Sequence, residues 1–151
     1  MRRVIRKLME RTRRSLGMDL LTSELTRMRE QLDPRLLTCA SQLVLANQYR
    51  ALAHQGGPFP GFQDVEFRAF SQNGEDGILL YIFSLIGMGG RRCVEICAGD
   101  GIECNTANLI VNHGWTGLMF DGNAQLIERG RAFYSRHGDT RSLPPRLVNA
   151  W

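Results

Sequence analysis

The stretch RRCVEICAGDGIECN, residues 91–105, joins a short apolar run to a turn that is rich in glycine. Its first part, RRCVEICA, predicts a strand that is buried on both faces, because the run is apolar and turn residues bound it. The turn contains Gly99 and Gly101, and small residues at such a turn let a backbone approach another group closely. The stretch therefore predicts the junction between the first strand and the first helix of an α/β domain.

Before this junction, the sequence predicts a helix that belongs to the same domain. It is expected to follow Ser71 or Asn73, either of which can accept from free helix N–H groups, and to end at Gly87. The expected buried face of this helix consists of Ile78, Leu79, Ile82, Phe83 and Leu85.

Helices and strands continue to alternate after the junction. A short helix is expected to end at Gly114, and a second buried strand is expected at residues 116–123. A third helix is expected to stop at Gly138, and a third strand to begin at residue 145. This order predicts an α/β fold with an incomplete, Rossmann-like parallel sheet of about three strands. Because an open α/β sheet usually has more strands, we expect the chain to be the front part of a longer fold.

The residues before Gly56 predict an N-terminal helical arm, residues 1–55. One apolar stripe of the arm consists of Leu21, Leu25, Met28 and Leu32, and a second consists of Leu36, Ala40, Leu43, Val44 and Leu52. Such an arm either packs on the α/β part or forms a coiled coil in a homodimer. The run GGPFPG breaks the helical pattern, so residues 56–69 are expected to be a linker and residues 70–151 the α/β domain.

The positive charge of the chain is concentrated at its start. Residues 1–16 hold seven basic residues and one acidic residue, a net charge of 7 − 1 = +6, whereas the whole chain carries +4. Since the basic residues are not spread over the expected domain, no nucleic-acid partner is expected. No run approaches the roughly 18 apolar residues that a membrane-spanning helix needs, so we expect a cytoplasmic protein without a membrane span.

The cysteines and histidines do not form a recognisable metal or catalytic motif. No pair of cysteines has the spacing of a zinc or redox site, so no bound metal is expected. Small buried side chains in a reducing compartment are expected for Cys39, Cys93, Cys97 and Cys104. Near helix ends, His54, His113 and His137 are expected at the surface, whereas Trp115 and Trp151 are expected to be packing residues.

An acid follows the glycine turn at a distance that suggests a nucleoside ligand. Asp121 lies twenty residues after Gly101, at the end of the second expected strand, where it can accept both hydroxyls of a ribose. The only lysine is Lys7, which excludes a triphosphate-binding loop. Cys104 stands where a dinucleotide turn has its third glycine. These residues favour a nucleoside without a pyrophosphate, and a dinucleotide-dependent oxidoreductase remains an alternative.

Two motifs resemble those of a known family. VEICAGDG, residues 94–101, resembles the first motif of class I S-adenosylmethionine-dependent methyltransferases, and GLMFDGN, residues 117–123, resembles the acidic motif that follows it. The run from Phe70 to Trp151 resembles the FkbM-type branch of that family. The resemblance implies the S-adenosylmethionine-binding portion of a methyltransferase, with O-methylation of a sugar, another glycan or a natural product.

The resemblance also implies roles for individual residues. Its cofactor-binding set is Glu95, Cys97, Ala98, Gly99, Asp100, Gly101, Asn105, Asp121, Gly122 and Asn123. Glu95 would lie near the methionine amino end of the cofactor, and Asp121 would hold the ribose hydroxyls. Gly122 and Asn123 would stand beside the adenine, and Asn105 would cap the first helix near the site. The turn itself would lie beneath the cofactor.

Upstream residues and departures from the family pattern leave alternatives open. Gln72 and Glu75 could line the mouth of the pocket, although helix capping also explains Glu75. Cys97 replaces the first glycine of the family motif, and the later strands, whose loops usually hold the methyl acceptor, fall outside the sequence. No catalytic residue is therefore assigned. The alternative is a non-catalytic, methyltransferase-like remnant that acts as an interaction module.

Overall fold

The computed structural model describes residues 34–150, with side chains from residue 39 onward. The chain divides into two compact units after Leu37, and the contacts of the fold and the site lie within the second unit. The apolar stripe expected at residues 21–32, the side chain of residue 36 and the packing role expected for Trp151 lie outside the described residues. The expected limits of the helical arm and of the linker stay predictions.

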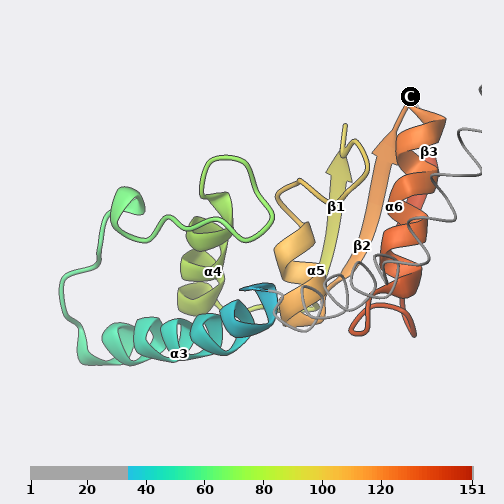
Figure 1. Ribbon diagram of the computed structural model, residues 1–151. Coiled ribbons are helices and arrows are strands. Elements are labelled where there is room, and N and C mark those ends of the chain that lie inside the picture. Colours follow the sequence, from blue (N-terminus) through green and yellow to red (C-terminus); the bar gives the residue numbers. More distant parts are fainter. Residues whose placement is uncertain (1–33, 151) are drawn as a thin grey trace, which may run out of the picture. The chain divides into compact units, whose positions relative to one another are not determined.

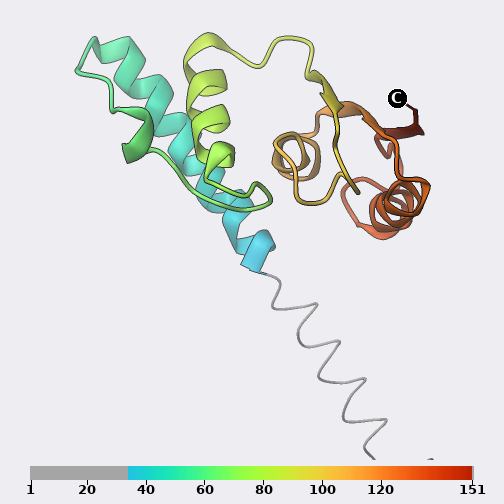
Figure 2. The same ribbon diagram turned by 90° about the horizontal axis from the view of Figure 1, so that it is seen from above.

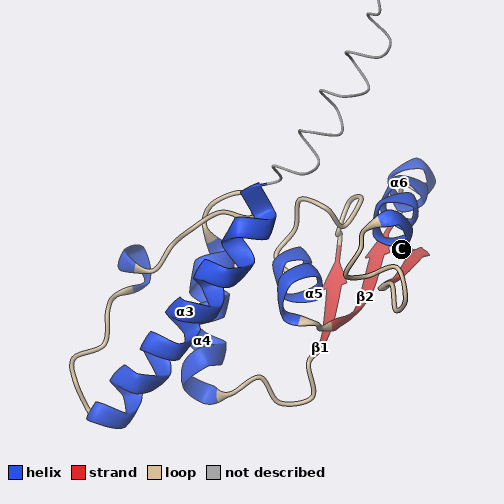
Figure 3. Ribbon diagram, turned by 60° about the horizontal axis from the view of Figure 1, so that its bottom comes forward, coloured by secondary structure: helices blue, strands red, loops and turns tan. Residues whose placement is uncertain are grey.

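A parallel sheet forms the centre of the second unit. Its strands are β1 (Arg92–Ile96), β2 (Thr116–Asp121) and β3 (Arg146–Asn149), in the order β1-β2-β3. The crossover helices are α5 (Ala107–His113), between β1 and β2, and α6 (Ala124–Arg136), between β2 and β3 (Figures 1 and 3). The sequence prediction of an α/β fold with an incomplete, Rossmann-like sheet and a helical N-terminal region is confirmed.

Only one face of the sheet is covered among the described residues. Met119 is 0% exposed and packs in one core cluster with Ile110 of α5 and Ile127 of α6. On the opposite face, Val94 is 63% exposed and Ile96 is 73% exposed. The prediction that the first strand is buried on both faces was therefore wrong. Successive crossovers of the same hand, in the order β1-β2-β3, put both helices on the same face.

The helix before the sheet, α4 (Glu75–Ile86), begins and ends largely as predicted. The Ser71 hydroxyl oxygen accepts from the Asp76 N–H at 3.1 Å, which confirms one of the two predicted capping groups. The N-cap position itself is Gly74, in the left-handed conformation. The helix ends at Gly87, whose φ of 87° is a conformation that glycine adopts without strain.

The buried face of α4 differs from the predicted one. Its buried residues are Asp76, Gly77, Leu80, Tyr81 and Ser84, whereas the five apolar residues predicted there are only partly buried. The helix packs so tightly on the preceding loop that a Cβ on Gly77 would lie 2.0 Å from the Val65 carbonyl oxygen. Because the loop backbone fits only against a glycine, it fixes the rotation of α4 and overrides the apolar periodicity.

Helix α3 (Pro34–Gln55) also presents a different face from the predicted one. Ala40, Leu43 and Val44 are exposed, whereas Gln42 and Ala46 are buried. The helix packs beside α4, where the rings of Tyr49 and Tyr81 meet edge to face at 4.9 Å (Figure 2). The side of α3 that faces the domain therefore carries Gln42, which has polar partners, instead of the predicted apolar stripe.

Those partners belong to α5. The Gln42 and Asn108 side-chain amides donate to each other at 3.1 and 2.9 Å, and Asn112 Nδ2 donates to Asn108 Oδ1 at 2.7 Å. His113 Nε2 lies 2.7 Å from Gln42 Oε1 and is only 7% exposed, so the expectation of a surface histidine was wrong. The network satisfies polar groups that would otherwise be costly to bury.

The buried imidazole makes the stability of the fold depend on pH. Burial lowers the pKa of His113 from its ordinary value of 6.5, and Arg91 and Arg50 lower it further, against an opposing effect of Asp76. Below pH 6.5 the unfolded chain takes up this proton more readily than the folded chain, so the free energy of unfolding should fall as the pH decreases. Urea unfolding at pH 7.5 and 5.5 measures the loss. His113→Gln should lose less stability between these pH values, and equal losses would contradict the assignment.

Candidate functional site

The turn after β1 is built from residues in the left-handed conformation. Cys97, Gly99 and Gly101 have φ values of 60°, 61° and 68°. The turn closes with a hydrogen bond from the Gly101 N–H to the Ala98 carbonyl at 2.8 Å. A Cβ on Gly101 would lie 2.6 Å from Met119 Sδ, so this position needs glycine for space as well as for φ.

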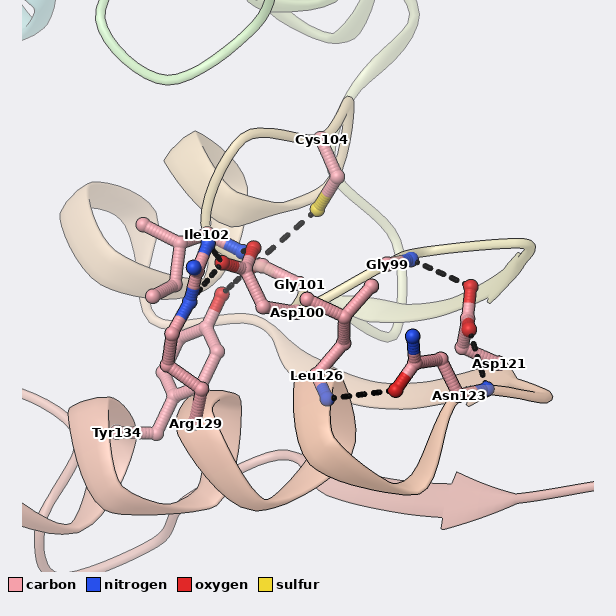
Figure 4. A network of polar contacts seen from close by, with 10 residues as sticks. All are labelled: Gly99, Asp100, Gly101, Ile102, Cys104, Asp121, Asn123, Leu126, Arg129 and Tyr134. Atoms are coloured by element: carbon pink, nitrogen blue, oxygen red, sulfur yellow. Dashed lines mark hydrogen bonds and ion pairs between the residues drawn. The ribbon is translucent and has the colours of Figure 1, made fainter.

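Asp121 connects this turn to the end of β2. Its Oδ2 accepts from the Gly99 N–H at 2.8 Å, and its Oδ1 accepts from the Asn123 N–H at 2.8 Å (Figure 4). The residue is only partly buried. Because a carboxylate has about four acceptor sites, about two remain for a ligand. The structure therefore brings the glycine turn and the predicted ribose-binding acid together.

Asn123 begins α6. Its side-chain oxygen accepts from the Leu126 N–H at 3.3 Å (Figure 4). It also accepts from the Gln125 N–H at 3.0 Å, so the side chain caps the helix. Asn123, which was predicted to stand beside the adenine, therefore also has a structural role as the N-cap of α6. At its other end α6 stops at Arg136, with His137 in an extended conformation, so the expected stop at Gly138 was wrong by a short distance.

Two hollows lie at the carboxyl ends of β1 and β2, where ligands bind in open α/β sheets. One has a volume of about 580 Å³ and is lined by Asp121, Gly122, Asn123, Ala124 and Gln125. The other has a volume of about 310 Å³ and is lined by Ile96, Cys97, Phe120 and Ala150. The first offers polar groups and the second a mostly apolar wall. Gln72 and Glu75 line neither of them.

Glu95 is engaged by the chain itself. Its two oxygens accept from the Asn105 N–H at 3.0 Å, from the Thr106 N–H at 2.9 Å and from the Thr106 hydroxyl. The carboxylate therefore fastens the start of α5, whose N-cap position is Thr106. The prediction that Asn105 caps this helix was wrong, because Glu95 on the neighbouring strand supplies the acceptor. About one acceptor site of Glu95 remains free.

Asp100 joins the turn to α6. Its Oδ1 accepts from the Ile102 N–H at 2.9 Å, and its Oδ2 pairs with the Arg129 guanidinium (Figure 4). Burial raises the pKa of this carboxyl, but the Ile102 hydrogen bond and the Arg129 charge outweigh burial and leave the pKa below its usual value. The carboxylate is thus a support of the turn, with both oxygens occupied.

Tyr134 and Gly130, which sequence reasoning did not single out, complete this support together with Cys104. The Tyr134 hydroxyl and the Cys104 thiol both donate to the Gly101 carbonyl, and burial raises the pKa of the Cys104 thiol to about 12 (Figure 4). A Cβ on Gly130 would lie 2.1 Å from the Asp100 carbonyl oxygen. The one signal available in the sequence was Gly130 itself, an isolated glycine inside a helical pattern.

Glu75 is used at the start of α4. It accepts from the Asn73 N–H at 2.8 Å, and hydrogen bonds from its own backbone N–H and that of Asn73 lower the pKa of its carboxyl. Helix capping thus accounts for this residue, and Gln72 beside it is exposed.

Cys97 differs from its sequence expectation. It is exposed rather than buried, whereas Cys104 is buried, and the described part of the chain contains no disulfide. Its φ of 60° belongs to the left-handed region, which costs a residue with a Cβ about 1–2 kcal/mol.

Replacing Cys97 by glycine should therefore stabilise the fold. Relief of the backbone strain exceeds the extra flexibility that glycine gives the unfolded chain, and we expect a gain of about 0.5–1 kcal/mol. Urea unfolding measures it. Cys97→Ser keeps the Cβ and should match the wild type, which separates the effect of φ from that of the thiol. A destabilised Cys97→Gly variant would show that the side chain itself holds the turn.

The remaining observations concern metals, membranes and related proteins. Within residues 34–150, no group of three or more histidine, cysteine, aspartate or glutamate side chains could hold a metal ion. No helix in the same range is long and apolar enough to cross a membrane. No protein-family model, curated protein or solved structure matches this chain. The chemistry of the site is therefore the basis for assigning a function.

Proposed function

We propose that the α/β part, from residue 70 onward, is the S-adenosylmethionine-binding portion of a methyltransferase. The observation that carries the proposal is the Asp121 carboxylate. It stands at the tip of β2, is partly exposed, and is held in place by the Gly99 and Asn123 N–H groups. A fixed carboxylate with about two free acceptor sites suits the two hydroxyls of a ribose.

The surroundings of Asp121 fit the nucleoside end of this cofactor. The apolar hollow beside Phe120 and Ile96 suits a purine ring, which is flat and largely apolar on its faces. Asp100 uses its two oxygens to join the turn to α6, and neither it nor Glu95 favours a phosphate group nearby. The site therefore favours a nucleoside without a pyrophosphate over a dinucleotide or a nucleoside triphosphate.

The methionine end fits less completely. Glu95 already accepts three hydrogen bonds from the start of α5, and about one acceptor site remains for an ammonium group. We therefore expect most of the affinity to come from the nucleoside end, so that S-adenosylhomocysteine binds nearly as tightly as S-adenosylmethionine.

When bound, S-adenosylmethionine supplies an electrophilic methyl group. The contribution of this chain is to hold and orient the cofactor, and alignment of two reacting centres is a large part of catalysis in such transfers. The acceptor class, an oxygen of a sugar, glycan or natural product, rests on the sequence resemblance alone. The cytoplasmic location stays a prediction from the sequence.

Calorimetric titration tests the proposal. S-adenosylmethionine and S-adenosylhomocysteine should both bind the folded chain, and NAD and ATP should bind more weakly. An absence of heat from both sulfur-containing nucleosides, with circular dichroism showing an intact fold, would overturn the proposal. Tighter binding of NAD would instead favour a dinucleotide-dependent oxidoreductase.

The second candidate is a non-catalytic interaction module. Two observations favour it: Glu95 is engaged by the chain, and Cys97 carries a Cβ in a left-handed turn position. Under this candidate the chain stays folded, binds neither nucleoside, and Cys97→Gly restores no binding. Binding that appears only in Cys97→Gly would instead identify a methyltransferase site that has lost affinity.

A further inference from the structure

Helix α3 is held to the α/β part through a buried polar interface. The Gln42 and Asn108 side chains are each 1% exposed and bond to each other through both of their amide groups. His113 Nε2 lies 2.7 Å from the same Gln42 side chain. When such groups separate, water replaces the lost partners, so the net cost of each broken hydrogen bond is small. This interface is therefore one that can open without unfolding the sheet.

The apolar part of the interface is small. Among the described residues, the hydrophobic core cluster contains no residue of α3. Ala46 is buried, whereas Leu43 and Val44 are 53% and 57% exposed. The edge-to-face rings of Tyr49 and Tyr81 supply the aromatic contact. Because burial of apolar area is the main stabilising term of a fold, α3 is held more weakly than the helices that pack on the sheet.

A glycine hinge follows α3. Gly56 is exposed and has a φ of 66°, and no atom lies within 4 Å of the place where a Cβ would stand. Gly57 comes next, and two successive glycines give the backbone wide freedom. The Pro60 carbonyl then accepts from the Tyr81 hydroxyl at 3.2 Å, which fastens the chain to α4 again. Residues 39–55 can therefore move away while the chain from Pro60 onward stays in place.

His113 is the group in this interface that changes charge between pH 5 and 8. The charged side chains near it are Arg91 before β1, Arg50 of α3 and Asp76 of α4. Burial, followed by the two arginines, lowers the pKa of the docked imidazole, and the single carboxylate opposes them. Water reaches the imidazole once α3 leaves, and its pKa then returns to about 6.5. Acid therefore favours the state in which α3 is released.

We propose that α3 is an acid-released arm: a proton on His113 frees residues 39–55 from the α/β part, with Gly56 and Gly57 as the hinge. Release uncovers Tyr81 on α4 and Asn108 on α5. The docked state binds fewer protons than the released state, so docking is fully stable above pH 6.5 and weakens as the pH falls below it. A histidine of pKa 6.5 shifts this equilibrium toward release by up to about tenfold between pH 7.5 and 5.5.

Hydrogen–deuterium exchange of the full chain tests the proposal. Protection, the ratio of intrinsic to observed exchange rate, is measured at pH 7.5 and 5.5. At both pH values residues 39–55 should be at least about 100-fold less protected than β2, because α3 opens without global unfolding. Their protection should fall by about five- to tenfold from pH 7.5 to 5.5. Low urea concentrations should change the exchange of β2 steeply and that of α3 little, because release exposes little surface.

Two histidine variants identify the group that takes up the proton. His113→Gln keeps a side-chain amide that can donate to Gln42, so α3 should stay docked at pH 7.5 and lose less than about twofold protection at pH 5.5. His54→Gln is the matched control, because this histidine is exposed on α3, and it should behave like the wild type.

The titration of His113 in the wild type gives a test that needs no variant. Nuclear magnetic resonance of the imidazole nitrogens should show a neutral ring at pH 5.5 wherever α3 is docked. A ring that becomes charged near pH 6.5 while α3 stays docked would overturn the proposal. Equal protection of α3 and β2, equal protection of α3 at the two pH values, or a His113→Gln variant that loses as much as the wild type would overturn it as well. None of these measurements depends on nucleoside binding.

Discussion

Replacing Gly130 by alanine should destabilise the fold by about 3 kcal/mol, a large cost for a single methyl group. The new Cβ would lie 2.1 Å from the Asp100 carbonyl oxygen and 2.4 Å from Leu147 Cδ2. The backbone of the turn cannot easily move, because Tyr134 and Arg129 hold it from the same helix. In an exposed helix the same change would stabilise the protein by about 1 kcal/mol. A loss of stability in Gly130→Ala would therefore by itself indicate the close contact with the turn.

Urea unfolding followed by circular dichroism measures this effect. Gly138→Ala is the matched control, because no atom lies within 4 Å of its added Cβ and its φ is not positive. That variant should unfold within about 0.5 kcal/mol of the wild type. If Gly130→Ala were as stable as Gly138→Ala, the close contact between α6 and the turn would not exist as described.

Asp121→Ala should weaken S-adenosylmethionine binding by at least about 100-fold. Hydrogen bonds to a charged group contribute about 1.5–3 kcal/mol each, and the variant loses the acceptor for both ribose hydroxyls. It also leaves the Gly99 and Asn123 N–H groups without their acceptor, so some loss of stability should accompany the loss of affinity.

Asp121→Asn separates these two effects. It keeps nearly the same shape and one acceptor oxygen, but its amide NH2 leaves either the Gly99 or the Asn123 N–H without an acceptor, so it should lose less stability than Asp121→Ala and bind the nucleoside about tenfold more weakly than the wild type. Glu128→Ala removes one negative charge from an exposed position on α6 and should change neither property. Calorimetry with S-adenosylmethionine and with adenosine measures the affinities. Wild-type affinity in Asp121→Ala would remove the main support for the proposed function.

The order of the elements could be predicted from the sequence because it depends on local chemistry. Glycine after a helix, as at Gly87 and Gly114, marks a backbone that must become left-handed, and this requirement is visible without any tertiary contact. The same holds for the turn at Gly99 and Gly101 and for the spacing to Asp121. Local backbone geometry thus determined the three strands, the crossover helices and the meeting of the turn with the acid.

The burial of each element could not be predicted from its own residues. The rotation of α4 depends on a loop backbone that fits against Gly77, and the rotation of α3 depends on polar partners in α5. Likewise, the apolar residues of β1 suggest burial on both faces, whereas the direction of the crossovers leaves Val94 and Ile96 exposed. The spacing of apolar residues indicates which face of a helix or strand is apolar, but it does not show which neighbouring segment covers that face.

At the candidate site, too, some features could be predicted from the sequence and others depend on tertiary contacts. The sequence by itself determined that a glycine turn and Asp121 meet at the ends of β1 and β2, because parallel strands carry their carboxyl ends to one edge. Only the tertiary structure decided that Glu95 fastens α5 and that Asp100 pairs with Arg129. A carboxylate accepts from whichever donors lie nearest, and those donors come from segments that are distant in sequence.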